Sequence, residues 1–249
     1  MTHESSSKIL TAPELRRFQH QIEHKQIGLR GQEKIKAANV IVIGAGGMGA
    51  QVLQFLAATG VGNITIVDDG LVTENAIQVQ TLYGGNDLGK LKTIISRQQL
   101  QNLYPLTNFN ILNLRISSEN AERFLTGCDL IVDATNSSVS NYIINDACIK
   151  LKKSWIYGRT SGTYAETTVF NYLNGPSYRC LYPDSSGTEK KEPALALVYG
   201  TLGCVMAAEC IKLLLGSKDV LSGKVLNIDL FSNIFVQQNL TRVDENFNI

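Results

Sequence analysis

Three glycines in the stretch VIGAGGMG have the spacing of a phosphate-binding turn. Gly44, Gly46 and Gly49 form the pattern G-x-G-x-x-G, directly after a β-branched run and directly before a helical pattern. In that context the first glycine permits a tight turn, the second lets backbone N–H groups approach phosphate oxygens, and the third allows helix and strand to pack closely. The N-terminus of the helix adds about half a positive charge. The pattern therefore predicts a site for a phosphorylated ligand.

An acidic residue stands where such a site needs one for a ribose. Asp68 lies nineteen residues beyond Gly49, at the end of the next β-branched run, and is placed to accept hydrogen bonds from ribose hydroxyls. The glycines and the acid together predict a nucleotide, but they do not distinguish ATP from NAD or FAD. The alternative interpretation is a structural glycine turn that binds nothing.

These residues fall within an alternating pattern of strands and helices. Residues 40–43 and 64–67 are apolar on both faces, which is typical of strands buried in a parallel sheet. The segment between them has the apolar spacing of a helix and would form the right-handed crossover. The alternation continues with expected helices at residues 90–102, 118–125 and 139–151, and expected strands at 109–114 and 130–133.

The two ends of the chain depart from this alternation. Helix-forming residues dominate from Pro13 to Lys36 and predict two short helices with a kink near residues 28–31. After Trp155 the sequence predicts strands with turns, then a largely apolar helix ended by Gly216 and two further strands. The predicted fold is therefore α/β: a Rossmann-like, doubly wound, mostly parallel sheet with an N-terminal helical arm and antiparallel C-terminal strands.

Length and composition fit one large domain. The chain has 249 residues, of which 44% are hydrophobic and 18% charged, which is enough to bury a sizeable core. Residues 1–12 are polar and lack periodicity, so we expect a flexible tail there and a single nucleotide-binding domain over residues 13–249. The segment from Pro183 to Ala194 combines turn formers with charges and is expected to be a mobile loop.

The charge balance argues against a polyanionic partner. The 23 basic and 22 acidic residues nearly cancel, so we expect neither nucleic acid nor a membrane as a partner. The sequence shows no leader-like pattern and no apolar run of membrane-spanning length, so a cytoplasmic protein is expected. The five cysteines are odd in number and include no C-x-x-C pair, which indicates reduced thiols.

Five stretches, taken in order, carry a wider likeness: GAGGMGAQVLQFLAATGVGNITIVDDG, TLYGGNDLGKLK, DLIVDAT, YRCL and GTLGCVMAAECIKLLLG. Together they resemble the ThiF/MoeB/HesA family, bacterial relatives of ubiquitin-activating enzymes, over about residues 14–240. The resemblance implies a homodimer that binds ATP with Mg²⁺ and adenylates the free C-terminal carboxylate of a small ubiquitin-like protein, usually a sulfur carrier, or of a peptide. The fold alone does not settle the substrate.

The resemblance also implies roles for individual residues. Those it assigns to the phosphate loop and the ribose are Gly44, Gly46, Gly47, Gly49 and Asp68. Asn75 matches a polar residue that meets the nucleotide. Lys92, in LGKLK, matches a lysine that neutralises phosphate charge as pyrophosphate leaves. Lys90 lies close enough in the sequence to compete for that role.

Four site positions depart from the family pattern. In the family, the strand that ends just before residue 136 is usually followed by the pattern D-x-T-D-N, whose second aspartate holds Mg²⁺. This chain has Asn136 at the position of that second aspartate. His20, in RFQHQ, stands where an arginine reaches the phosphates of the neighbouring subunit's ATP. Val79 and Asn141 replace two further arginines. Arginine stabilises spreading negative charge in a way that His20 matches only when protonated.

These departures lower the expectations for metals. Asn136 keeps one ligand oxygen but lacks the charge that Mg²⁺ favours, so we expect a weakened Mg²⁺ site. The alternative interpretation is that Asp133 or Asp69 supplies a displaced metal ligand. Zinc is not expected. Many relatives have a C-x-x-C pair where this chain has PSYRC, in which Ser177 takes the place of the first cysteine and Cys180 that of the second, and the C-terminal segment has no cysteine.

Three hypotheses follow. The first is an adenylyltransferase that binds ATP through the glycine loop, Asp68 and Asp133, with Lys92, Asn136 and His20 at catalytic positions. The second is a catalytically impaired relative that acts as a scaffold or regulatory partner, which the lost charges favour and the intact loop opposes. The third is an NAD(P)- or FAD-dependent oxidoreductase, which needs the same loop and acid but does not account for the later stretches.

Overall fold

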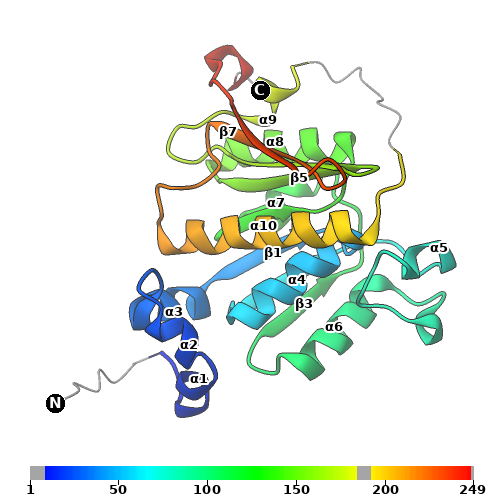
Figure 1. Cartoon of the computed structure of the whole chain (residues 1–249), viewed down its shortest axis with the longest axis vertical. Coiled ribbons are helices and arrows are strands. Elements are labelled where there is room, and N and C mark those ends of the chain that lie inside the picture. Colours follow the sequence, from blue (N-terminus) through cyan, green and yellow to red (C-terminus); the bar gives the residue numbers. More distant parts are fainter. Residues whose placement is uncertain (1–8, 184–191, 248–249) are drawn as a thin grey trace.

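The centre of the molecule is one eight-stranded sheet with the strand order β3-β2-β1-β4-β5-β6-β7-β8 (Figure 1). The computed structural model describes residues 9–183 and 192–247. Pairing is parallel from β3 to β5 and antiparallel from β5 to β8. The strands are β1 (Asn39–Ile43), β2 (Asn63–Val67), β3 (Asn108–Leu112), β4 (Leu130–Asp133), β5 (Trp155–Ser161), β6 (Tyr164–Phe170), β7 (Lys224–Asp229) and β8 (Ile234–Asn239). The predicted mostly parallel sheet with antiparallel C-terminal strands is confirmed.

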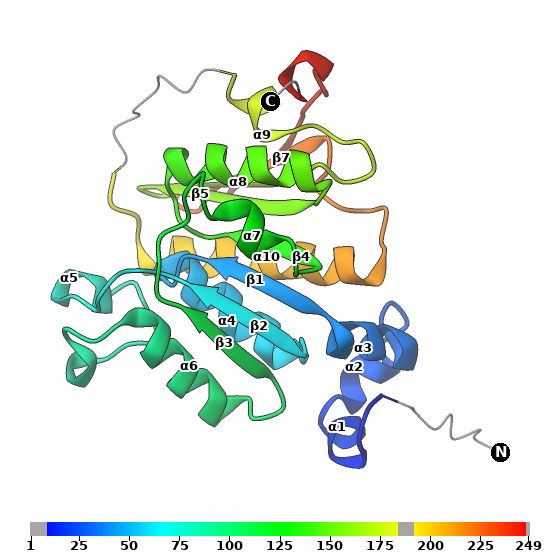
Figure 2. The same ribbon diagram turned by 180° about the vertical axis from the view of Figure 1, so that it is seen from behind.

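Helices cover both faces of this sheet (Figures 1 and 2). Along β1, Val40 and Val42 belong to one apolar cluster, with α4, α6 and α10, whereas Ile41 and Ile43 belong to the other, with α7, α8 and α9. Strand β1 is therefore buried on both sides, which explains its continuous β-branched sequence. The helices are α4 (Gly47–Thr59), α5 (Glu74–Ile77), α6 (Lys92–Leu103), α7 (Ala121–Leu125), α8 (Ser138–Leu151), α9 (Tyr178–Leu181) and α10 (Ala196–Leu215).

The N-terminal arm has three helices: α1 (Ala12–Arg17), α2 (Gln19–Glu23) and α3 (Gly28–Ala37). The prediction of two helices was wrong, because the chain breaks at Phe18 and again between His24 and Ile27, ahead of the expected kink. A salt bridge of 2.7 Å from Lys36 Nζ to Glu14 Oε1 ties α1 to α3.

Two predicted segments fall partly or wholly outside the described residues. Residues 1–8 of the expected tail are not described, but Leu10 is buried and Thr11 caps α1 through its side chain. Residues 184–191, within the expected mobile loop, are also not described.

Helix α10 is long and apolar enough, by length and composition, to cross a membrane, and it is the one such helix among the described residues. In this fold it packs along α4 and against β5 and β6. The contact with α4 is close, since a Cβ on Gly203 would lie 2.4 Å from the Cβ of Gln51. Part of its apolar surface therefore belongs to the core of the sheet.

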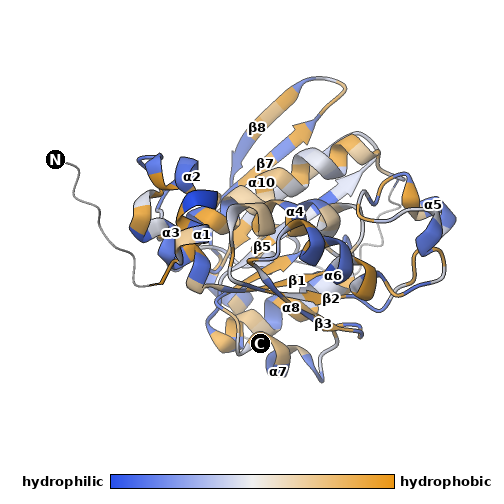
Figure 3. Cartoon of the chain, turned by 90° about the horizontal axis from the view of Figure 1, so that it is seen from below, coloured by the Kyte–Doolittle hydropathy of each residue, from blue (hydrophilic) through white to orange (hydrophobic). Residues whose placement is uncertain are grey.

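The last two strands form a hairpin that extends away from the helical layers (Figure 3). Strand β8 is exposed along its whole length, including Ile234, Phe235 and Val236. The exposed edge of the sheet is thus its antiparallel end at β8, and the parallel half positions the site described next.

Candidate active site

A cavity of about 470 Å³ opens at the carboxyl ends of β1, β2 and β4. The chain leaves β1 toward β2 and β3 on one side, and later returns to place β4 on the other side of β1. A reversal of this kind in an open α/β sheet leaves a crevice at the strand ends, where ligands bind. The cavity is therefore where the topology of the fold places a ligand site.

The glycine loop lines one wall of this cavity, and each glycine has its own reason to be there. Gly44 has φ +97°, and a Cβ on Gly49 would lie only 1.9 Å from the Gly44 carbonyl oxygen. A Cβ on Gly46 would meet no atom within 4 Å, so it would occupy the open cavity. Gly47 instead makes room for the ring of Tyr199 on α10, and it does not line the cavity.

Asp68 lines the cavity and also orders the glycine loop. Its Oδ2 accepts from the backbone N–H of Ala45 at 2.7 Å, and its Oδ1 accepts from the N–H of Gly70 at 2.7 Å. A carboxylate can accept about four hydrogen bonds, so both oxygens keep capacity for ribose hydroxyls. The two backbone contacts hold the carboxylate in one orientation at the end of β2.

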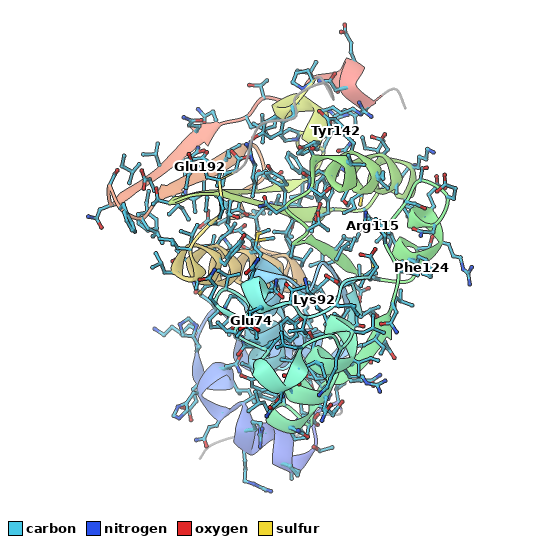
Figure 4. The ribbon with its side chains drawn as sticks, turned by 90° about the vertical axis from the view of Figure 1, so that its right-hand side faces the viewer. Glu74, Lys92, Arg115, Phe124, Tyr142 and Glu192 are labelled. Atoms are coloured by element: carbon cyan, nitrogen blue, oxygen red, sulfur yellow. The ribbon has the colours of Figure 1, made fainter. Side chains whose placement is uncertain are left out.

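Lys92, and not Lys90, is the lysine at the cavity. Lys92 is the first residue of α6, its N–H donates to the Gly70 carbonyl at 3.1 Å, and its side chain lines the cavity. Lys90 points to the surface, where its Nζ lies 3.4 Å from Asp87 Oδ1. Figure 4 shows Lys92 on the face of the molecule that carries the strand ends.

Three helix N-termini open on this cavity. They belong to α4 after Gly46, to α6 at Lys92 and to α8, which Ser137 caps by accepting from the N–H of Ser140. A helix N-terminus carries a partial positive charge that favours a bound anion. Together with the Lys92 ammonium group, the three N-termini make this end of the sheet suited to a polyphosphate.

Asn136 lies beside the cavity, but its amide is directed into the sheet. Its Nδ2 donates to the Thr160 carbonyl at 3.1 Å and to Thr160 Oγ1 at 3.2 Å, while its Oδ1 accepts from the Thr160 N–H at 3.2 Å. The residue has φ +54°, a conformation that asparagine tolerates. Its neighbours Thr135 and Ser137 line the cavity, whereas Asn136 itself does not. Asn136 therefore joins the end of β4 to the end of β5.

Asp133, the last residue of β4, holds the loop that contains Thr135 and Asn136. It is fully buried, and its carboxylate accepts from the N–H and hydroxyl of Thr135 and from Nδ2 of Asn141 at 2.6 Å. With Asn136 turned toward Thr160 and Asp133 enclosed by these donors, the residues at this strand end do not fit a Mg²⁺ site held by the protein. Asp69 does line the cavity, where its carboxylate pairs with Arg115.

The change Asn136→Asp is expected to destabilise the fold by about 1–3 kcal/mol, because aspartate cannot donate to the Thr160 carbonyl. Urea unfolding measures this free energy. The same change at the exposed Asn75 is the matched control and should alter stability by less than about 0.5 kcal/mol. A stable Asn136→Asp variant with stronger Mg²⁺-dependent activity would instead show that this position holds the metal.

Two predicted site residues lie away from the cavity of this chain. Asn75 is exposed on the short helix α5, and His20 is exposed on α2 in the N-terminal arm. The arm leads through α3 into the amino end of β1, whereas the cavity is at the carboxyl end. Within one chain, His20 is therefore not brought together with Lys92 and the glycine loop.

Tyr83 is a buried residue in contact with the glycine loop, and sequence reasoning did not single it out. Its buried hydroxyl donates to the Ala45 carbonyl at 2.7 Å and lies 2.8 Å from Ser96 Oγ, which must then donate to it. Burial raises the pKa of Tyr83 well above its ordinary value, so the hydroxyl stays a donor. The phenol thus connects the glycine loop to α6, the helix that Lys92 begins.

Tyr83→Phe is expected to lower both the free energy of unfolding, by about 1–3 kcal/mol, and the affinity for nucleotide, because the Ala45 carbonyl loses its buried donor. Thermal unfolding and calorimetric titration with ATP test the two effects. Tyr172→Phe removes a hydroxyl that donates to the remote Ser217 carbonyl at 2.9 Å. This control should lose stability alone, and equal effects of the two variants on affinity would refute a positioning role for Tyr83.

The C-terminal segment meets α9 without cysteine pairs. Cys180 Sγ accepts from the Val243 N–H at 3.3 Å, and Asn246 Nδ2 donates to the Arg179 carbonyl at 3.0 Å. The Arg242 guanidinium lies 3.6 Å from the centre of the Phe247 ring. Among the described residues, no group of three or more His, Cys, Asp or Glu side chains could hold a metal ion. Hydrogen bonds and a cation–π contact hold this segment in place.

Comparison with known proteins adds to this geometry. Residues 18–247 match the ThiF family. A probable molybdopterin-synthase adenylyltransferase of Porphyra purpurea is 36% identical over 228 residues, which cover 89% of this chain and 60% of that protein. A sulfur carrier protein adenylyltransferase of Thermus thermophilus is 36% identical over 242 residues, which cover 93% of this chain and 89% of that protein.

Two further similarities are limited, one in the length of the related protein that is covered and the other in sequence identity. An adenylyltransferase and sulfurtransferase of Culex quinquefasciatus is 36% identical over 221 residues, and this chain spans only 50% of its length. The crystal structure of E. coli MccB with ATP has a TM-score of 0.77 at 22% identity, over 85% of this chain and 66% of that one. The structural likeness bears on the fold alone.

Proposed function

The chain belongs to the ThiF family, and on that basis we propose that it is an adenylyltransferase that binds ATP in the cavity at the carboxyl ends of β1, β2 and β4. The observation that carries this proposal is the convergence of the glycine loop, three helix N-termini and Lys92 on one cavity beside the Asp68 carboxylate. The names of the relatives from Porphyra and Thermus support the same activity. None of those names supports a scaffold or an oxidoreductase.

We propose the following division of labour within the cavity. The Gly44–Gly49 loop and the N-termini of α4 and α6 receive the triphosphate, and Asp68 holds the ribose. A carboxylate oxygen of the acceptor attacks the α-phosphorus, and the bond between that phosphorus and the oxygen bridging to the β-phosphorus breaks. Pyrophosphate leaves with the bonding electron pair, and the acceptor becomes an acyl adenylate. Lys92 stabilises the charge that develops on the phosphate oxygens.

We propose a small carrier protein with a free C-terminal carboxylate as the acceptor. Support comes from the Thermus relative, which is named a sulfur carrier protein adenylyltransferase. The match with this chain covers 89% of the length of that protein. A peptide is the second candidate, because the E. coli MccB structures, which share the fold, include complexes with MccA.

We further propose that two copies of the chain pair through α10. Within one chain, only 44% of the most apolar stretch of this helix is buried. In soluble proteins, helices as apolar as this one usually have such surface covered. A groove of about 720 Å³ runs between α10, α4 and the arm, and its apolar residues include Ile27, Phe55 and Ile211. Sedimentation should show a dimer that Ile211→Glu converts to a monomer. A wild-type monomer at micromolar concentration would contradict the pairing.

Exchange of labelled pyrophosphate into ATP tests the proposed activity, because reversal of adenylation requires the acyl adenylate. Exchange is expected only when a carrier protein with an intact C-terminal Gly-Gly is present. The carrier lacking its last glycine is the matched control. Calorimetry should show that the chain binds ATP more tightly than NAD⁺. Binding of ATP without exchange for any carrier or peptide would favour the scaffold hypothesis, and preference for NAD⁺ would favour an oxidoreductase.

A further inference from the structure

Arg115 lines the cavity and was not among the predicted site residues. It lies three residues beyond β3, and its Nε donates to Asp69 Oδ2 at 3.1 Å. Its side chain is 79% exposed, whereas that of Asp69 is 44% exposed, so the pair sits at the rim of the cavity. The guanidinium group uses one N–H for this contact, and the exposure of the side chain leaves further N–H groups and its planar face accessible.

The cavity has two chemically different ends. Lys92 and the N-terminus of α4 lie on the side of the sheet that α4, α6 and α10 cover, and this is the phosphate end. The other side has an apolar wall formed by Ile43, Val67 and Ile116, which belong to the cluster packed with α7 and α8. Figure 4 shows Arg115 on the α7 side and Lys92 on the α6 side of this edge.

The apolar end matches the base of a nucleotide whose phosphates lie at the other end. Asp68 also lines the cavity, and the proposed function assigns it to the ribose that joins the base to the phosphates. The planar guanidinium of arginine stacks on aromatic faces, and a pair with a carboxylate limits its freedom before the ligand arrives. An exposed salt bridge adds little stability by itself, so stability does not account for the pair.

We infer that Arg115 is a base-binding residue: its guanidinium plane covers the purine ring of the bound nucleotide, and Asp69 holds it in that position. This inference rests on the proposed nucleotide site and adds a determinant of affinity at the base end. It also explains the two adjacent acids, because Arg115 neutralises Asp69 and leaves Asp68 for the ribose.

The number of phosphates distinguishes a base-binding arginine from a phosphate-binding one. We would titrate the wild type, Arg115→Ala and Arg115→Lys with AMP, ADP and ATP by calorimetry. Arg115→Ala should weaken binding of all three nucleotides by the same factor, roughly 3- to 30-fold. Arg115→Lys should not restore affinity, because lysine lacks the planar face. Lys92→Ala should show a loss that increases from AMP to ATP.

Arg123→Ala is the matched control, since Arg123 is an exposed arginine on α7 that does not line the cavity. It should bind all three nucleotides like the wild type. An unchanged Arg115→Ala affinity would overturn the inference and leave the proposed function standing. A loss that grows with the number of phosphates, or full rescue by Arg115→Lys, would also overturn it. A wild type that binds no nucleotide would overturn both the inference and the proposed function.

Discussion

Replacement of Lys92 by alanine is expected to lower the rate of AMP transfer by about 10²–10³-fold, the usual effect of removing one group that stabilises transition-state charge. The effect is large because Lys92 is the one lysine among the described residues that lines the cavity, and Val79 and Asn141 stand at two positions where the resemblance leads us to expect arginines. Fewer cations remain to share the developing charge. The fold should be little affected, since the Lys92 contact with Gly70 is made by the backbone.

Pyrophosphate exchange measured at saturating ATP isolates this effect from binding. Lys90→Ala is the matched control, because Lys90 lies two residues earlier and pairs with Asp87 at the surface. It should keep the wild-type rate. Lys92→Arg retains the charge in a larger side chain and should recover part of the activity. If Lys90→Ala and Lys92→Ala lose activity equally, the assignment of Lys92 to the reacting phosphates is wrong.

A methyl group on Gly49 is expected to disrupt the glycine loop itself. The added Cβ would lie 1.9 Å from the Gly44 carbonyl oxygen, and a backbone atom cannot rotate away as a side chain does. The turn must open, which also moves the Ala45 N–H away from Asp68. Gly49→Ala should therefore lose nucleotide binding and at least about 1–3 kcal/mol of stability.

Gly46→Ala is the informative counterpart of this variant. A Cβ at Gly46 meets no protein atom within 4 Å, so the fold should lose much less stability than with Gly49→Ala. The same methyl group projects into the cavity, where it should hinder the approach of phosphates. Thermal unfolding combined with ATP titration separates the two outcomes. Normal ATP binding by Gly46→Ala would mean that the phosphates lie elsewhere.

The sequence predicted the frame of the site well because that frame depends on local rules. β-Branched runs apolar on both faces, the glycine spacing and the position of Asp68 after the next strand depend on turn chemistry and on side-chain periodicity. Parallel strands then bring their carboxyl ends to one edge, so the loop and the acid meet in the cavity. Arg115 had the same positional signal, since it follows a predicted strand, but a lone arginine there does not stand out.

The tertiary structure decided which way individual side chains point. Asn136 was read as a weakened metal position, but its amide binds Thr160, which lies 24 residues further along the chain. Tyr83 supports Ala45 across 38 residues, and no local pattern reveals that contact. The sequence alone thus determined the fold class and the wall of the site, through interactions between near neighbours. Contacts between distant segments decided whether each polar side chain faces the ligand or braces the loop that holds it.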